Sequence, residues 1–379
     1  MINRKKIVFV AHSGKQVDCN PLAIFEKLYN IKGGELEYVW LVKKELIKHL
    51  IVKYKEYKNI SFVDYDSEKA TKEIRSCAIY INNQLMIKHY NKGVRKQVGQ
   101  LFINTWHGSF GLKKIPLRDR AQTITDSCLE FDYFLSNSKF ESKVYRESFG
   151  KNTVPLEIGH PRNDYLLKNH SSREIKKNIG IDEKKQVVLW LPSARDAFDD
   201  ENFQLNLSKL RKSLHHRFDG DWQILYRFHR NNLDDYPTEQ FKECIDVSHY
   251  SNLNELLYVA DVVISDYSSV ICDYILLNRP VFIYAPDYEQ FTSFNPLYWD
   301  LNKLPFGLAK SSDELCENIS KFDTDNYSKR IQLWLDEVGC IETGKASDCI
   351  SSIILEFLEG KCETLLKYTN IISVSYTHL

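Results

Sequence analysis

A histidine that follows a short apolar run is the first residue of this chain that could do acid–base chemistry. His107 lies in Asn104-Thr105-Trp106-His107-Gly108, directly after the apolar run Leu101–Ile103. Such a run is typical of a buried strand, and a histidine at the end of that strand is well placed to act as a general base. The alternative is a histidine that is hydrogen-bonded within the core.

Two further clusters combine histidine with arginine. Tyr226-Arg227-Phe228-His229-Arg230 again follows an apolar run, and its two cations suit a phosphate better than a metal ion. The alternative is a basic surface patch. Ile158–Asp164 contains Arg162 between a proline and an asparagine, which suggests a contact with an anion or substrate, or equally a turn that joins two domains.

The fourth cluster is a pair of serines between a predicted strand and a predicted helix. Val262–Ile264 is apolar, Ser268 and Ser269 follow it, and a helical run extends over 270–277 until Pro280. A helix N-terminus after a parallel strand favours an anion, although the serines could only cap the helix. Asp273 interrupts the apolar helix face, so it needs a partner or ligand unless it faces solvent.

Several familiar sites are absent from the sequence. It contains no GxGxxG after the first strand, no Walker P-loop, no HExxH, no CxxC and no GxSxG. The classes of site that depend on these motifs can therefore be set aside. The residues predict an enzyme that binds a phosphate-bearing donor through serine, histidine and arginine on one domain, with a histidine base on the other.

Composition limits the partners that need to be considered. The 379 residues include 51 Lys+Arg and 51 Asp+Glu, so no net charge points to nucleic acid. Nine cysteines without a CxxC pair are typical of free thiols in a reducing cytoplasm. We find no apolar run of about 18 residues that could span a bilayer.

Strands and helices alternate along the whole chain, which predicts an α/β protein with doubly wound parallel sheets. The apolar spacing lapses between residues 164 and 183 and then restarts. We therefore predict an N-terminal Rossmann-like domain at 1–165, a C-terminal Rossmann-like domain at 166–360 and a tail at 361–379. Two such domains would place their carboxyl-edge loops across a cleft, where ligands bind.

Taken together, these clusters resemble the CDP-glycerol glycerophosphotransferase family, whose members build teichoic acids and related capsular polymers in bacteria. The resemblance extends from about residue 7 to residue 349. The motifs that carry it are, in chain order, Ser13-Gly14-Lys15, Asn20-Pro21, Thr105-Trp106-His107-Gly108, Ser136-Asn137-Ser138, Ile158–Asp164, Leu191–Asp196, Arg227-Phe228-His229, Asp246-Val247-Ser248, Ser265–Ser269 with Asp273, and Gly344–Ser347.

The resemblance implies a GT-B arrangement with CDP-glycerol bound mainly by the C-terminal domain. It also implies that neither a dedicated catalytic metal nor a cofactor is needed. His107 would be the base that deprotonates the acceptor hydroxyl, and His229 would bind the donor diphosphate. Further donor contacts would come from Arg162, Arg227, Asp246, Ser268, Ser269 and Asp273. The sequence departs from the family pattern at Arg230, where a proline is common, and at Ser109-Phe110-Gly111, where Thr-Pro is frequent.

The expected reaction is transfer of glycerol phosphate from CDP-glycerol to a hydroxyl of a lipid-linked saccharide or of a growing poly(glycerol phosphate), with release of CMP. The alternatives are a CDP-ribitol or nucleotide-sugar donor on the same fold, and a catalytically inactive scaffold. A lipid-linked acceptor implies a peripheral position on the cytoplasmic face of the cell membrane. The basic residues that could contact its headgroups are Lys88, Lys92, Arg95, Lys96, Lys113, Lys114, Arg118 and Arg120, unless these form an ordinary solvated face.

Overall fold

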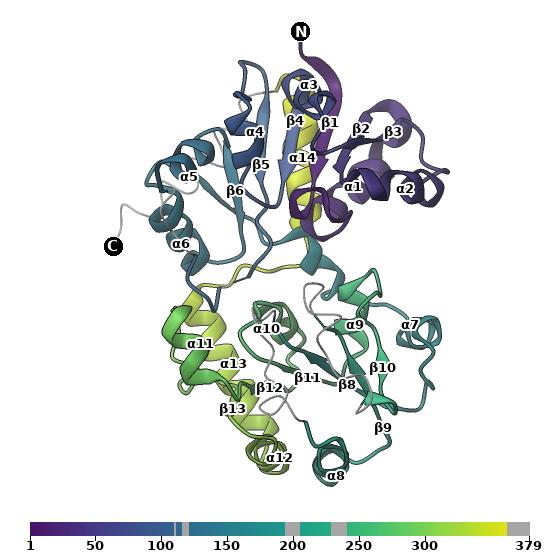
Figure 1. Ribbon diagram of the computed structural model, residues 1–379, viewed down its shortest axis with the longest axis vertical. Helices are drawn as coiled ribbons and strands as arrows, with labels where there is room; N and C mark the ends of the chain where they lie inside the picture. The colour runs from purple at the N-terminus through teal and green to yellow at the C-terminus, as the bar shows by residue number, and fades with distance from the viewer. Residues whose placement is uncertain (110, 116–120, 194–204, 229–240, 362–379) are drawn as a thin grey trace. The chain divides into compact units, whose positions relative to one another are not determined.

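The computed structural model describes residues 1–109, 111–115, 121–193, 205–228 and 241–361. The chain forms two compact units, each with its own parallel sheet (Figure 1). Within the described residues, unit 1 consists of 1–107, 121–165 and 340–361. Unit 2 consists of 108–115 and 166–339, apart from the gaps given above.

Unit 1 is built on a seven-stranded sheet in the order β3-β2-β1-β4-β5-β6-β7. Its strands are nearly continuous apolar runs such as Ile7–Val10, because a parallel sheet is covered by helices on both faces. The strands are β1 (Asn3–Val10), β2 (Glu37–Val42), β3 (Ile60–Asp64), β4 (Cys77–Asn82), β5 (Leu101–Asn104), β6 (Tyr133–Ser136) and β7 (Pro155–Glu157). The helices are α1 (Cys19–Lys32), α2 (Ile47–Lys53), α3 (Glu68–Ser76), α4 (Ile87–Asn91), α5 (Ala121–Cys128), α6 (Lys139–Phe149) and α14 (Ala346–Leu358), with a 3₁₀ turn at Pro161–Tyr165.

Unit 2 repeats this plan with a six-stranded sheet in the order β10-β9-β8-β11-β12-β13. Its strands are β8 (Gln186–Leu191), β9 (Trp222–Tyr226), β10 (Ile245–Asp246), β11 (Val262–Ser265), β12 (Val281–Tyr284) and β13 (Gly307–Ala309). Its helices are α7 (Ser172–Ile179), α8 (Leu207–Phe218), α9 (Leu253–Val259), α10 (Val270–Tyr274), α11 (Tyr288–Phe294), α12 (Ser312–Ser320) and α13 (Thr324–Val338). The order of strands reverses between β8 and β11, as it does between β1 and β4 in unit 1, and ligands of such sheets bind at this point.

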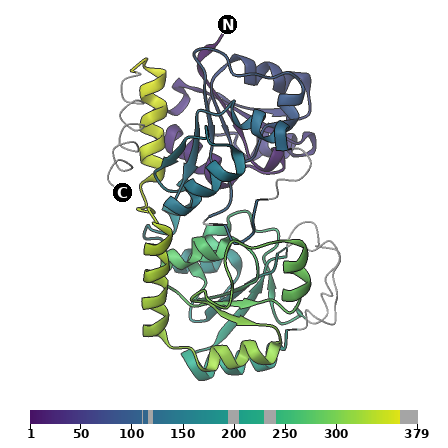
Figure 2. The same ribbon diagram turned by 90° about the vertical axis from the view of Figure 1, so that its left-hand side faces the viewer.

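The predicted domain division differs from the observed units at two places. Helix α14 belongs to unit 1, because Ile350 and Ile354 pack in the same buried core as Ile7 and Phe9 of β1. Figures 1 and 2 show this helix, in yellow, beside the purple N-terminal elements. Residues 108–115 belong to unit 2, where the backbone of Leu112 accepts a hydrogen bond of 2.9 Å from Tyr298.

Helix α7 forms inside the stretch that we predicted to be a domain boundary. The side chain of Ser171 caps its N-terminus by accepting from the backbone of Glu174, and Gly180 ends it in the left-handed conformation. Ile175 is the buried residue of this helix, so the sequence shows almost no apolar period there.

The helix predicted over 270–277 is shorter than expected, because α10 gives way to a 3₁₀ turn at Ile275–Leu277. The predicted tail lies outside the described residues from 362 onward.

The structure also bears on the cysteines and on membrane crossing. Each cysteine of the described chain is a free thiol. None of the helices in the described ranges is both long and apolar enough to cross a bilayer.

Candidate active site

Three loops at the carboxyl edge of the unit 1 sheet bring two histidines together. His12 follows β1, Asn83 follows β4 and His107 follows β5, so the loops lie at and beside the point where the strand order reverses. The rings of His12 and His107 lie 5.6 Å apart, edge to face. The backbone N–H of His12 donates to Oδ1 of Asn83 at 2.8 Å.

The hydrogen bonds of His107 define its tautomer. Its Nδ1 lies 2.8 Å from the carbonyl oxygen of Asn83, and because a carbonyl can only accept, Nδ1 carries the proton. Nε2 then presents a lone pair, and it has no hydrogen-bond partner among the described residues. The ring is half-buried and stacks obliquely on Trp106, with the ring centroids 4.6 Å apart. His107 therefore has the form that a general base requires.

The charges around His107 keep it neutral. Burial, and after it the charge of His12, lowers the pKa of His107 to about 4. Burial alone would lower the pKa of His12 too, but its hydrogen bond with the Cys19 thiol and the charge of Asp18 outweigh burial and raise that pKa. The two histidines thus differ in the direction of their shifts, a pattern that is common where one group accepts protons and its neighbour carries charge.

Arg162 lies in this same cluster. It is buried in the 3₁₀ turn after β7, and its Nη1 lies 3.6 Å from Sγ of Cys19. Burial would raise the pKa of Cys19, but the charge of Arg162 and the hydrogen bond with His12 lower it. From the sequence, Arg162 was placed in the N-terminal domain and proposed as a donor contact, and the structure likewise has it in unit 1, in the cluster with His107.

The backbone at this edge has unusual dihedral angles. His12, Ser13, Cys19 and Trp106 have φ angles of 47°, 54°, 59° and 49°, which residues other than glycine rarely adopt. Such conformations persist only where the surrounding structure enforces them, and they are common at functional sites.

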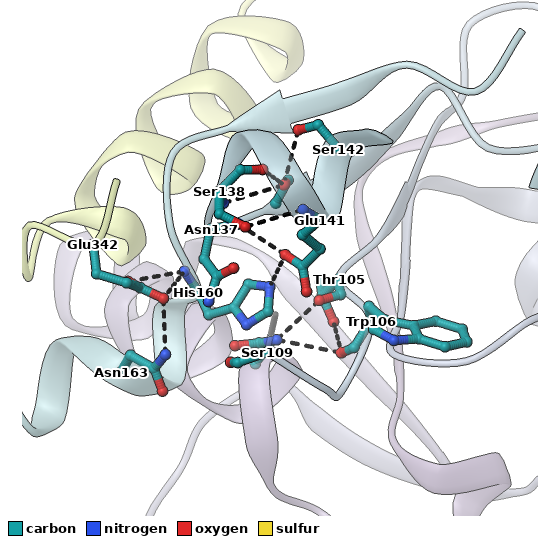
Figure 3. A network of polar contacts seen from close by, with 12 residues as sticks. Thr105, Trp106, Ser109, Asn137, Ser138, Glu141, Ser142, His160, Asn163 and Glu342 are labelled. Carbon is teal, nitrogen blue, oxygen red and sulfur yellow. Dashed lines mark hydrogen bonds and ion pairs between the residues drawn. The ribbon is translucent and has the colours of Figure 1, made fainter. Parts of the chain in front are cut away.

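A buried ion pair, drawn in Figure 3, lies close enough to the cluster for its charge to act on His107. Nε2 of His160 lies 3.0 Å from the carboxylate of Glu141, and burial of both side chains is nearly complete. Burial would lower the pKa of His160, but the charge of Glu141 raises it. The carboxylate of Glu342 accepts from the backbone N–H of His160 at 3.2 Å and from Asn163 at 2.8 Å.

Gly159 makes this arrangement possible. It has a φ of +89°, and a Cβ there would lie only 2.7 Å from the Glu342 carboxylate.

Glu141, Glu342 and Asn83 were missed in the sequence analysis, because each lies outside a recognisable motif and joins the site only through the fold.

At the corresponding edge of unit 2, the side chains mainly contact one another. The carboxylate of Asp266 accepts from the backbone and the hydroxyl of Ser193, at 3.0 and 2.6 Å, and so joins the ends of β8 and β11. Ser268 and Ser269 are half-buried, and Oγ of Ser268 accepts weakly from the N–H of Val270 at 3.4 Å. Among the described residues, none accepts from the backbone N–H groups of Ser268 and Ser269.

The remaining candidates of unit 2 have different environments. Asp273 is buried and accepts a short hydrogen bond from the hydroxyl of Ser109, which is the partner that its position on an apolar helix face requires. Arg227 donates to the carbonyls of Val247 and Tyr250, at 3.2 and 2.6 Å. Asp246 is exposed, and its Oδ1 accepts from the N–H of Ser248 at 2.8 Å. His229 lies outside the described residues.

The predicted basic residues are largely engaged by acids. Lys88 pairs with Asp66, Lys96 pairs with Asp132, and Arg95 lies 3.6 Å from Glu130. Lys92 donates to the backbone carbonyl of Asp66 at 2.9 Å. Lys113 and Lys114 belong to unit 2, and Arg118 and Arg120 lie outside the described residues. In the described part of the chain, no group of three or more His, Cys, Asp or Glu side chains is arranged to bind a metal ion.

A model of the family described as CDP-glycerol:poly(glycerophosphate) glycerophosphotransferase matches residues 1–356. The chain belongs to this family. The CDP-glycerol glycerophosphotransferase that the sequence predicted is thereby confirmed as the enzyme class.

Relatives of similar length support the same conclusion. The chain is 26% identical, over 91% of its length and 90% of the other's, to the teichoic acid poly(glycerol phosphate) polymerase of Bacillus spizizenii strain W23. It is 27% identical, over 93% and 94%, to the teichoic acid glycerol-phosphate transferase of Staphylococcus aureus strain NCTC 8325. Other polymerases are longer, since the chain spans 49% and 51% of two of them.

The fold is that of a solved structure, the wall teichoic acid polymerase TagF. The two share a TM-score of 0.79 and 23% identity, over 96% of this chain and 91% of that one. This likeness confirms the predicted fold class, α/β with two Rossmann-like doubly wound units of the GT-B type.

Proposed function

We propose that this glycerophosphotransferase acts in teichoic acid synthesis, with His107 as the base that activates the acceptor hydroxyl. An acceptor oxygen attacks the phosphorus that carries the glycerol of CDP-glycerol, and the bond from that phosphorus to the oxygen of CMP breaks. The acceptor proton passes to Nε2 of His107, and CMP leaves. The observation that carries this proposal is the tautomer of His107, which presents a lone pair on a half-buried ring.

The donor diphosphate is assigned to unit 2. Ser268 and Ser269 offer two hydroxyls and two backbone N–H groups where the strand order reverses, and hydrogen bonds to charged groups contribute about 1.5–3 kcal/mol each. His229 and Arg227 are proposed to add positive charge. Arg227 would do so while it anchors the loop after β10. Asp246 and Asp273 remain proposed donor contacts, and Arg162 is proposed to contact an anionic group from unit 1.

The test is the activity of purified His107→Ala with CDP-glycerol and a lipid-linked acceptor. Loss of a well-placed base typically lowers the rate by about 10²–10⁴-fold, and we expect a loss in this range with normal binding of CDP-glycerol. Full activity of His107→Ala would contradict the assignment. An inactive wild-type protein that does not bind CDP-glycerol in calorimetry would instead indicate a scaffold.

The acceptor is proposed to be a lipid-linked saccharide or a poly(glycerol phosphate) chain. Incubation with CDP-glycerol, CDP-ribitol and nucleotide sugars, with detection of the released nucleotide, separates the possible donors. The length of the product then separates a primase, which adds one unit, from a polymerase, which adds many. We expect CMP release with CDP-glycerol, and release with CDP-ribitol alone would overturn the donor assignment.

We also propose that the protein lies peripherally on the cytoplasmic face of the membrane. A second set of basic residues in unit 1 is a further candidate for anionic headgroups. Its members line one hollow along α6 together with Glu147, which lies 3.8 Å from Lys143, and they are Lys139, Lys143, Arg146 and Lys151. The first three recur at intervals of four and three residues and so share one helix face.

Co-sedimentation with vesicles tests this proposal. Each basic residue near an anionic surface is expected to contribute roughly 1 kcal/mol to binding. Lys139→Glu with Lys143→Glu should reduce binding to vesicles that contain phosphatidylglycerol. The matched variant Lys88→Glu with Lys92→Glu should change it less, because those lysines already contact Asp66. Binding to neutral phosphatidylcholine vesicles as strong as to anionic ones would contradict an electrostatic contact.

A further inference from the structure

Two fully buried asparagines contact the backbone directly before His107. Asn20 comes from the first turn of α1, and Asn104 is the last residue of β5. Buried amides are costly unless they form hydrogen bonds, so their contacts indicate what they stabilise.

Asn20 joins three separate segments of unit 1. Its Nδ2 donates to the carbonyls of Thr105 and Trp106, at 2.9 and 3.3 Å, and its Oδ1 accepts from the backbone N–H of Arg162 at 3.1 Å. The amide orientation is therefore defined by its partners, since only its nitrogen can face two carbonyls and only its oxygen can face an N–H.

Asn104 completes the contacts of the same peptide. Its Oδ1 accepts from the N–H of Trp106 at 2.8 Å, and its Nδ2 donates to the carbonyl of Gln84 at 2.9 Å. Both backbone polar groups of Trp106 are thus bound by asparagine side chains. Trp106 has a φ of +49°, a conformation that is unfavourable for a residue with a side chain. The asparagines offset this cost and determine the direction in which the chain enters His107.

We propose that Asn20 is a positioning residue for His107, which keeps Nε2 directed toward the acceptor hydroxyl through the backbone of Thr105 and Trp106. The inference rests on the proposed role of His107 as the base. Asn20 does not touch the reacting atoms. It also links His107 to Arg162, so one buried amide fixes the base and a cation of the same cluster.

Aspartate cannot replace Asn20, although it has the same shape. A carboxylate cannot donate to the carbonyls of Thr105 and Trp106, and it would place a negative charge against their oxygens. Asn20→Asp should therefore release the Trp106 peptide while it keeps an acceptor for the N–H of Arg162.

The chain offers a matched control in Gln100. This buried amide donates from Nε2 to the carbonyls of Ile74 and Cys77, at 2.8 and 2.7 Å, and accepts from the N–H of Gln97 at 2.9 Å. It has the same pattern of two donors and one acceptor as Asn20. It lies just before β5, however, at the end of the sheet opposite His107.

The experiment compares Asn20→Asp with Gln100→Glu in steady-state kinetics and thermal unfolding. We expect both to lower Tm, but only Asn20→Asp to lower kcat, by about 10–100-fold, because a displacement of about 1 Å at a reacting group has effects of this size. KM for CDP-glycerol should change less than about twofold, because a residue that acts on the chemical step alone alters kcat and leaves donor binding unchanged. Should Asn20→Asp not fold, Asn20→Ser, which keeps one donor, is expected to lower kcat by about tenfold.

Two outcomes separate this inference from the function that it rests on. If His107→Ala is inactive and Asn20→Asp retains the kcat of Gln100→Glu, the positioning role is wrong and the base assignment stands. If His107→Ala is fully active, the proposed base is wrong, whatever Asn20→Asp does. A rise in KM without a fall in kcat would also contradict the positioning role.

Discussion

The carboxyl edges of the two sheets have the same strand topology but opposite chemistry. In unit 1 the edge gathers His12, Cys19, His107 and Arg162 around strained backbone, and one ring nitrogen of His107 keeps its lone pair. In unit 2 the carboxylates contact nearby hydroxyls, as Asp266 does with Ser193, and the serine turn keeps backbone N–H groups available. One edge is thus suited to move a proton and the other to bind an anion.

The largest expected effects are on kcat and KM, which should respond differently to changes at the two edges. His107→Ala should lower kcat and leave the KM for CDP-glycerol near its normal value. Ser268→Ala combined with Ser269→Ala should mainly raise KM, by about tenfold or more, since each lost hydrogen bond to a phosphate costs about 1.5–3 kcal/mol. Calorimetric titration of CDP-glycerol into both variants checks this division. Equal effects of the two changes on kcat would contradict this division of roles between His107 and the serines.

The next effect concerns stability and again differs between the edges. Glu141→Gln leaves His160 buried without its counter-charge, which should lower the free energy of unfolding by about 3 kcal/mol. Ser193→Ala removes one hydroxyl donor from Asp266 but keeps the backbone donor, so its cost should be about 1–2 kcal/mol. Urea unfolding followed by fluorescence measures both. A larger loss of unfolding free energy for Ser193→Ala would show that the buried ion pair of unit 1 contributes less to stability than the Ser193–Asp266 contact.

The smallest expected effect is on the pH dependence of the stability of unit 1. Burial lowers the pKa of His89 to about 4, from an ordinary value of 6.5. The unfolded chain therefore takes up a proton more readily, and the stability that His89 contributes is complete above pH 6.5 and lost as the pH falls from 6.5 toward 4. His89→Leu should reduce the drop in Tm between pH 7 and pH 4.5 by roughly 4–8 °C, because the shift is worth about 2 kcal/mol over this range. An unchanged slope in thermal scans would mean that His89 does not titrate over this range.

Much of the fold was predictable from the sequence, and the reasons are local. Strands such as Cys77–Asn82 are apolar up to their last residue, and α3 begins at a serine cap, so both have the local patterns that predict such elements. Helix α7 was missed because it buries little. Helix α14 was assigned to the wrong unit because many of its partners, such as Ile7 and Phe9, lie more than 300 residues earlier in the chain.

The candidate site was only partly predictable for the same reason. His107 stands out because it follows a buried strand, and the serine turn because it lies between a strand and a helix. Asn83 and Glu141 carry no local signal, and Asn20 belongs to a motif of the family resemblance that indicated no role for it. The roles of all three depend on a carbonyl or a side chain from a different loop. The position of Arg162 beside Cys19 likewise follows from the fold and not from the motif around it.

Helix α14 follows unit 2 in the sequence but packs in unit 1, which has a consequence for how the protein folds during synthesis. Ile350, Ile353, Ile354 and Phe357 complete a core whose other members begin at Ile7, so unit 1 cannot close until residues up to about 357 have left the ribosome. Unit 2 has no such requirement and can fold while the core of unit 1 is still incomplete and exposes apolar side chains. Until residue 357 is available, the unit that carries His107 is therefore the one more exposed to chaperones and proteases.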